Sequence, residues 1–195
     1  MAKWNDETSF FKASGNPFGL VDAVLLDQPD RRAHTSGVAR RAKVFGRICS
    51  ELDRVELYQA AVLHDVGYGV AVKDTGMHAI DGARFLKKAG FSSRVCALVA
   101  HHSFAALEAE LRGLSEELGE WSDERTSVRD ALWWADMTTG PSGEAMEVHD
   151  RMREIENRYG SGSLIANFIR EAGPELIGAV ERTEALLVAA NLKVT

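Results

Sequence analysis

Apolar residues recur along this chain at helical spacing, and strand-like alternation of apolar and polar residues is almost absent. The pattern predicts an all-α fold, organised as a single-domain helical bundle over residues 1–195. The expected helices span about residues 20–27, 32–50, 53–65, 78–89, 92–102, 104–118, 126–138 and 148–159, followed by an apolar helix from 163 that is broken at residues 173–174.

Turn and capping residues indicate where two of these helices start or end. Asp53 can cap the start of the helix that ends at Asp65, and Gly67 is suited to leave that helix in a left-handed conformation. Gly90 followed by Phe91 resembles a glycine C-cap with its apolar contact, which ends the next helix.

Composition limits the function classes. A chain of 195 residues with 45% apolar and 27% charged residues is typical of one globular domain. The net charge of −6 argues against nucleic acid as a partner. Cys49 and Cys96 suit a reducing cytosol, the N-terminal stretch lacks an apolar signal region, and no apolar run is long enough for a membrane span. We therefore expect a cytoplasmic protein; the oligomeric state stays open.

Candidate metal ligands gather in five short segments, which hold all but one of the six histidines. Imidazole nitrogen and carboxylate oxygen are ligands that hold zinc, iron, manganese or nickel. The strongest indication is Asp65, because it follows a helix that is apolar almost all round and is therefore expected to be buried. A buried carboxylate is costly unless it is paired or bound to a metal. The candidate ligands are His34, His64, Asp65, His78, His101, His102 and Asp136.

The ligands of a first metal ion come from separate helices. His34, His64, Asp65 and Asp136 are expected to point inward from facing helices, as in other helical-bundle metal sites. Asp65 has two oxygens and could bridge to a second ion. Two bridged metals can hold an attacking hydroxide between them.

The second ion would be bound by Asp65, His78 and one or both of His101 and His102. Consecutive residues on a helix differ by about 100° in direction. His101 and His102 therefore cannot both face one point unless the helix end is distorted, and the sequence leaves open which of them is the main ligand.

A second His-Asp dipeptide provides an internal comparison. His149 and Asp150 lie among charged neighbours, and the alternating charges from Glu144 to Arg158 predict an exposed helix face. We therefore assign no metal to this second dipeptide.

The order H…HD…H…HH…D resembles the HD superfamily of metal-dependent phosphohydrolases. The pattern H…HD…D is matched by His34, His64, Asp65 and Asp136. His78 opens an H-x-x-x-G-A segment that resembles the two-metal branches of the superfamily. The resemblance covers about residues 30–140, and residues 145–195 form a helical C-terminal extension without an assigned role.

The resemblance implies an enzyme that hydrolyses a phosphate ester or anhydride of a small molecule, such as a nucleotide, through a metal-activated hydroxide. It implies a binuclear site for divalent transition metals, with Fe, Mn, Zn, Ni and Co not distinguished, and a catalytic, bridging role for Asp65. Lys73, in the loop after the His-Asp pair, and Arg129, two helical turns before Asp136, are candidate phosphate clamps.

Two departures from the family pattern leave alternatives open. Tyr68 stands where many such phosphohydrolases carry a lysine, and the GYP signature of one branch is absent, which argues against a cyclic-di-GMP phosphodiesterase. The six-ligand arrangement also resembles that of mixed-valent di-iron oxygenases of the superfamily, which cleave C–H, C–C or C–P bonds. A third interpretation is a sensor that binds a nucleotide without turnover.

Overall fold

The structure, a computed structural model, describes residues 16–194, and this part of the chain confirms the all-α prediction. The N-terminal stretch, whose lack of an apolar signal region supported the prediction of a cytoplasmic protein, lies outside the described residues. Within 16–194 the only bridge of strand type joins Thr139 and Ala145, and no helix is both long and apolar enough to cross a bilayer. The α-helices are α2 (Pro17–Val24), α3 (Pro29–Phe45), α4 (Glu51–Leu63), α5 (His78–Lys88), α6 (Ser93–Ala100), α7 (Ala105–Arg112), α8 (Ser115–Leu118), α9 (Ser127–Met137), α10 (Val148–Tyr159) and α11 (Leu164–Ala189), and the 3-10 helices are η1 (Gly46–Ile48), η2 (Val66–Tyr68) and η3 (His102–Phe104).

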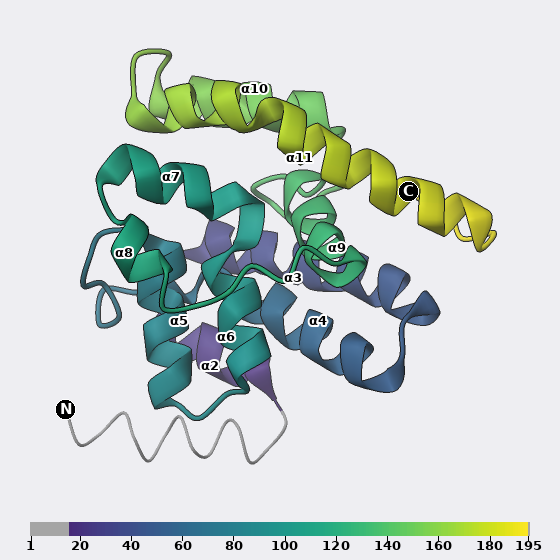
Figure 1. The fold of residues 1–195 in the computed structure, drawn as a ribbon, viewed down its shortest axis with the longest axis horizontal. Helices are drawn as coiled ribbons and strands as arrows, with labels where there is room; N and C mark the ends of the chain where they lie inside the picture. Colours follow the sequence, from purple (N-terminus) through teal and green to yellow (C-terminus); the bar gives the residue numbers. More distant parts are fainter. Residues whose placement is uncertain (1–15, 195) are drawn as a thin grey trace.

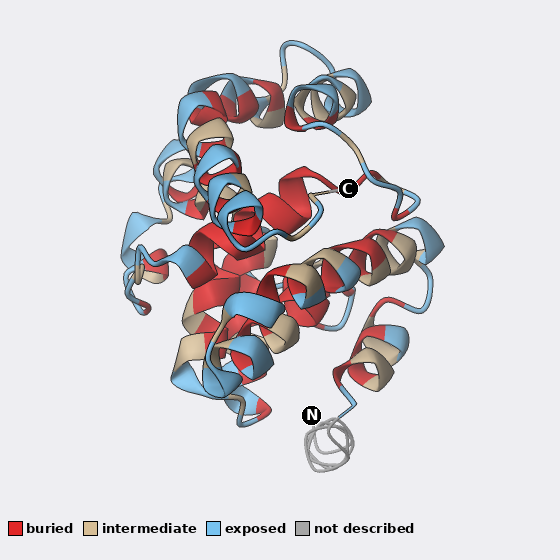
Figure 2. Ribbon diagram, turned by 90° about the vertical axis from the view of Figure 1, so that its right-hand side faces the viewer, coloured by how far each residue is buried: buried red, intermediate tan, exposed pale blue. Residues whose placement is uncertain are grey.

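The helices pack in two parts, a central bundle and a C-terminal pair that crosses it. In the bundle, α3 packs against α4 and α9, α4 packs against α6, and α5 packs against α6. Helices α10 and α11 contact each other, and α11 lies along α9 (Figure 1). The buried faces of the central helices turn toward one another, while exposed residues lie on the outside (Figure 2). This pattern follows from the helical spacing of apolar residues.

Helix α9 is the centre of the core. Its Trp133 and Trp134 are almost completely buried, and Trp134 donates a hydrogen bond to Glu184 of α11 over 3.3 Å. The last turn of α4, which carries Leu63 directly before His64, has no exposed surface. The apolar all-round segment is therefore a buried helix, as its composition predicted.

Two predicted helix ends come out differently. Helix α4 is capped by Ser50, whose hydroxyl accepts the backbone N–H of Asp53 at 3.2 Å and donates to the Asp53 carboxylate at 2.7 Å. Asp53 is therefore the third residue of the helix, and its prediction as the cap was wrong. At the other end of the region, Gly90 has φ +79° and the Phe91 N–H bonds to the Leu86 carbonyl at 3.0 Å, which confirms the glycine C-cap.

Gly67 has a different reason to be glycine from the one predicted. It lies in η2 without a positive φ, so the left-handed exit was wrong. A Cβ placed there would lie 1.9 Å from the carbonyl oxygen of His78. Glycine thus lets η2 touch the start of α5 and brings Asp65 close to His78.

The predicted break at Gly173 and Pro174 is also wrong, because α11 runs through it as one helix of 26 residues. Pro174 itself is exposed, while Gly173 and Leu176 are buried on the opposite side. A Cβ on Gly173 would lie 2.9 Å from the end of Met152 in α10. Packing of this buried face against α9 and α10 outweighs the proline penalty of about 3 kcal/mol.

Candidate metal centre

Six of the predicted ligands converge where the ends of α4, α5 and α6 meet the middle of α3 and the end of α9. They form two groups, and within each group the ligand atoms lie within 4.8 Å of one another. The first group is His34, His64 and Asp136, and the second is Asp65, His78 and His102.

Asp65 lies between the two groups and turns one carboxylate oxygen toward each. Its Oδ2 is 3.6 Å from Nε2 of His64, and its Oδ1 is 3.7 Å from Nε2 of His78. A bridging carboxylate needs this orientation, with its two oxygens directed to two different ions.

Backbone carbonyls fix the orientation of three imidazole rings. The Nδ1 atoms of His34, His64 and His102 lie 3.1, 2.8 and 2.6 Å from the carbonyl oxygens of residues 140, 61 and 99. Because a carbonyl oxygen only accepts, each ring must donate from Nδ1. Each Nε2 then carries a free lone pair directed into the site, which is the arrangement of metal-binding histidines.

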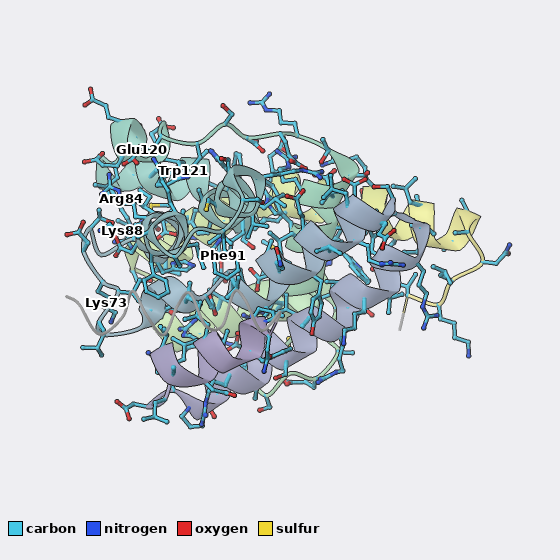
Figure 3. The ribbon with its side chains drawn as sticks, turned by 90° about the horizontal axis from the view of Figure 1, so that it is seen from below. Lys73, Arg84, Lys88, Phe91, Glu120 and Trp121 are labelled. Carbon is cyan, nitrogen blue, oxygen red and sulfur yellow. The ribbon has the colours of Figure 1, made fainter. Side chains whose placement is uncertain are left out.

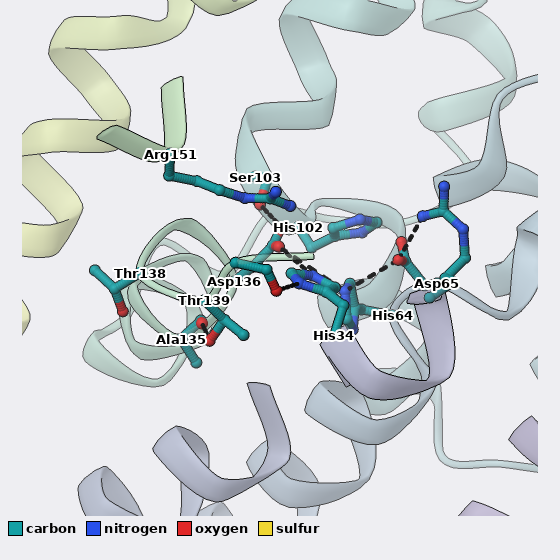
Figure 4. A network of polar contacts seen from close by, with 12 residues as sticks. His34, His64, Asp65, His102, Ser103, Ala135, Asp136, Thr138, Thr139 and Arg151 are labelled. Carbon is teal, nitrogen blue, oxygen red and sulfur yellow. Dashed lines mark hydrogen bonds and ion pairs between the residues drawn. The ribbon is translucent and has the colours of Figure 1, made fainter. Parts of the chain in front are cut away.

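Ring nitrogens and carboxylate oxygens of the two groups also lie close to one another at the centre of the site. Nε2 of His34 is 3.0 Å from Oδ1 of Asp136, and Nε2 of His78 is 3.0 Å from Nε2 of His102 (Figure 4 shows the first pair). Nε2 of His64 is buried and has no hydrogen-bond partner. Such a set is stabilised by cations at its centre, and its nitrogen and oxygen donors fit divalent transition metals.

Electrostatics holds these groups in the protonation states that metal binding requires. Burial lowers the pKa of His64, and burial together with His102 lowers the pKa of His78 well below its usual range. Burial raises the pKa of Asp65, but His64 and Arg31 lower it by more, so the net shift is downward. The pKa of Asp136 is also depressed despite burial, through its hydrogen bond with His34. Neutral rings at His64 and His78 and ionised carboxylates at Asp65 and Asp136 result.

His101 and His102 point in different directions just after the end of α6 at Ala100. His102 points into the site, whereas Nε2 of His101 donates to the carbonyl of Trp121 at 2.9 Å and joins neither group. The next two residues, Ser103 and Phe104, have φ of 47° and 60°, which is rare for non-glycine residues. These two residues lie between α6, which ends at Ala100, and α7, and the Ser103 hydroxyl donates to Asp136 (Figure 4).

Arg31 places a positive charge beside Tyr68, the residue that stands where many related phosphohydrolases carry a lysine. Its guanidinium donates to Oδ2 of Asp65 at 2.7 Å and lies 3.4 Å above the centre of the Tyr68 ring. The Tyr68 ring in turn stacks on the ring of His78, with centroids 4.1 Å apart. Arg31, which the sequence analysis did not identify, is thus tied to two of the central residues.

A cleft opens above the two groups. It consists of a cavity of about 100 Å³ that contacts the candidate ligands and an adjoining one of about 310 Å³ nearer the surface. Both are lined by His34 and by three arginines, Arg31, Arg151 and Arg158. Positive side chains therefore accompany the path from the surface to the metal ligands.

Neither predicted phosphate clamp lines this cleft. Lys73 is exposed at the edge of the molecule (Figure 3). Arg129 is buried against the ring of Trp133, and its guanidinium donates to Asp123 at 2.7 Å and to Asp130 at 2.8 Å. The charge of Arg129 is therefore compensated by Asp123 and Asp130. Neither Lys73 nor Arg129 is in a position to contact a ligand in this cleft.

The second His-Asp dipeptide lies apart from the site. His149 and Asp150 are exposed on α10, and Asp150 pairs with Arg153. Within the described part of the chain neither residue belongs to a group of potential metal ligands. The two dipeptides differ in burial, because His64 and Asp65 are buried whereas His149 and Asp150 are exposed.

Comparison with known proteins agrees with the geometry. The HD-domain family model matches residues 31–139, which contain all six converging ligands. The chain belongs to the HD-domain family. The helices α10 and α11 lie beyond the matched region of this HD-domain protein.

One similar protein is named Ribonuclease Y, from Rubrobacter xylanophilus (strain DSM 9941 / JCM 11954 / NBRC 16129 / PRD-1). It is 32% identical over 154 residues, which cover 75% of this chain and 27% of that protein. The HD-domain chain thus spans only about a quarter of the length of this relative. No solved structure matches the chain.

Proposed function

We propose that this HD-domain protein is a metal-dependent phosphohydrolase that cleaves a phosphate ester or anhydride of a small molecule such as a nucleotide. The observation that carries the proposal is the position of Asp65, which turns one oxygen to each of two ligand groups at the base of an arginine-lined cleft. Anionic substrate and divalent metals are the two components that this arrangement accommodates.

The six converging residues would hold two divalent ions. When bound, such ions activate a water molecule and polarise phosphoryl oxygens. Asp65 is placed to orient the attacking water, since its carboxylate lies between the groups. Arg31 would keep Asp65 ionised and fixed, and would face the phosphate from the same side. Phosphate binding is assigned to the cleft arginines instead of Lys73 and Arg129.

The test is phosphate release by purified protein whose metal content has been measured. The substrate panel consists of nucleoside mono-, di- and triphosphates, simple phosphomonoesters and a short single-stranded RNA, the last because of the relative named Ribonuclease Y. We expect release of phosphate or a nucleotide without oxygen. No release from any member of the panel with two metals bound would contradict the proposal.

The second candidate is a mixed-valent di-iron oxygenase that cleaves a C–H, C–C or C–P bond. The observation that favours it is the six-ligand histidine and aspartate set combined with Tyr68 in place of a lysine. Two irons in the purified protein, with oxygen consumption in the presence of an organic substrate and no anaerobic turnover, would support this candidate against hydrolysis.

A further inference from the structure

The wall of the cleft opposite the metal ligands is built by α10 and α11, outside the region that the family model matches. This wall combines positive and apolar side chains. The facing wall, which we call the ligand wall, carries the imidazoles and carboxylates of the two candidate ligand groups. Its main residues are Arg151, Ile155, Arg158 and Tyr159 from α10 and Phe168 and Ile169 from α11. We call these six residues the C-terminal wall.

Arg151 reaches from this wall into the site. Although it was expected on an exposed helix face, it is only 6% exposed, and its side chain extends toward Ser103 and Asp136 (Figure 4). Its Nη1 donates to Glu154 at 2.6 Å, but its buried Nε has no hydrogen-bond partner. A buried guanidinium with an unused donor is costly unless a ligand supplies an acceptor.

The charges around Arg151 leave the C-terminal wall positive. Glu154 is shared between Arg151 and Arg158, so one carboxylate faces two guanidinium groups. Among the acidic residues that line the inner cavity, Glu108 is paired with Arg112 at 2.7 Å, and Asp65 and Asp136 belong to the ligand groups. An anion in the cleft would therefore meet two arginines on this side that share a single glutamate.

The apolar part of the wall lies beside the arginines. Ile155 is half-buried between Arg151 and Arg158 in sequence, one turn from each, and Phe168 and Ile169 face the same cavity from α11. An inorganic ion would leave these side chains without a partner. A substrate with an apolar or aromatic substituent would cover them and gain from burial.

We infer that the C-terminal wall is the recognition subsite for an organic phosphate, with Arg151 and Arg158 binding its phosphoryl oxygens and Ile155 and Phe168 contacting the apolar or aromatic group attached to it. The inference rests on the proposed function, because the phosphate held here is the one that the metal centre would hydrolyse. Guanidinium is well matched to phosphate, since its planar fork offers paired donors.

Calorimetric binding to the metal-loaded protein tests this without requiring turnover. The probes are methyl phosphate and phenyl phosphate. We expect phenyl phosphate to bind more tightly, Arg151→Met to weaken both probes at least about tenfold, and Ile155→Ala to weaken phenyl phosphate alone. Arg153→Ala is the matched control, because Arg153 is exposed on the same helix and pairs only with Asp150.

Circular dichroism and metal analysis of each variant separate binding from folding, and Arg158→Gln, a change at a more exposed position, serves if Arg151→Met does not fold. Unchanged affinity of both probes in a folded arginine variant would overturn the inference. Equal affinity of the wild type for both probes would overturn its apolar part. Arginine-dependent binding without phosphate release would instead contradict the proposed hydrolysis and leave the subsite standing.

Discussion

The two walls of the cleft differ in how their side chains are held. On the ligand wall, histidine rings are fixed by backbone carbonyls at helix ends, and His64 and Asp65 are buried. On the C-terminal wall, two arginines share one glutamate, and elsewhere on the same helix the His-Asp dipeptide recurs at His149 and Asp150 on the exposed surface. The comparison teaches that burial and backbone anchoring, more than residue identity, distinguish the candidate metal ligands from an ordinary surface pair.

The largest effect is expected from Asp65→Ala. Removing the carboxylate that faces both groups should reduce metal content and lower the rate of phosphate release by at least about a hundredfold, the range for loss of a principal electrostatic element. Elemental analysis and steady-state kinetics measure the two effects. Asp150→Ala is the matched control, because it removes an aspartate from the exposed dipeptide. Equal losses in both variants would break the comparison between the walls.

His78→Ala tests whether the ligand wall holds two ions. His78 lies at the start of α5 with its Nε2 3.0 Å from that of His102, so its loss should empty the second group while the first keeps its metal. The metal content per chain should fall from two ions to one. Unchanged stoichiometry with unchanged activity would contradict the assignment of His78 to a second ion.

A paired experiment at neighbouring histidines sharpens the same point. His102→Gln should lose metal from the second group, whereas His101→Gln should keep it, because His101 bonds to the Trp121 carbonyl outside the site. Metal analysis of the two variants gives the answer. Loss of metal in the His101 variant, with normal metal in the His102 variant, would reverse the assignment.

Ser103→Ala is expected to have an intermediate effect. The Ser103 hydroxyl donates to Asp136, and loss of a hydrogen bond to a metal-binding carboxylate typically costs roughly tenfold or more in metal affinity or activity. Titration with a competing chelator measures the affinity. Ser103→Thr, which keeps the hydroxyl, should retain most of it, and equal affinity in the alanine variant and the wild type would show that Asp136 needs no such support.

The smallest effect concerns the support of the C-terminal wall. Pro174 is exposed inside α11, so Pro174→Ala removes little packing and restores a backbone donor. Alanine is favoured over proline inside a helix by more than proline gains from restricting the unfolded chain. We therefore expect the free energy of unfolding to rise by roughly 1 kcal/mol. Urea denaturation measures it, with Pro29→Ala, at the first position of α3, as the control that should not stabilise. A less stable Pro174 variant would contradict the expectation that proline is unfavourable at this position of α11.

Much of the ligand wall could be predicted because short-range features define it. A buried apolar helix followed directly by His64 and Asp65 demands a partner for the carboxylate, and helical periodicity gave the all-α class. The choice between His101 and His102 could not be predicted, since α6 ends at Ala100 and His101 already departs from helical dihedral angles without a glycine to signal it. Sequence spacing assumes a regular helix, and this helix end departs from it.

The C-terminal wall was missed for a different reason. Arg151 and Arg158 lie in a run of alternating charges, which is typical of an exposed face, and only the packing of α10 on α11 buries Arg151. Long-range packing also carries α11 through Gly173 and Pro174. Arg129 shows the opposite case. It lies near Asp136 in sequence, but its charge is paired with Asp123 and Asp130 and does not face the cleft. Charge pairing across helices is a tertiary property.

The turn at Ser103 and Phe104 has a consequence for how this protein can adapt to heat. Non-glycine residues in this conformation cost about 1–3 kcal/mol each, so glycine there would relieve strain. Yet glycine at the first position would release Asp136, and at the second it would remove the ring that packs on Trp133 with centroids 5.7 Å apart. At Ser103, relief of backbone strain would therefore favour glycine for stability, while the hydrogen bond to Asp136 favours serine. Variants that improve both stability and activity have to arise elsewhere in the chain.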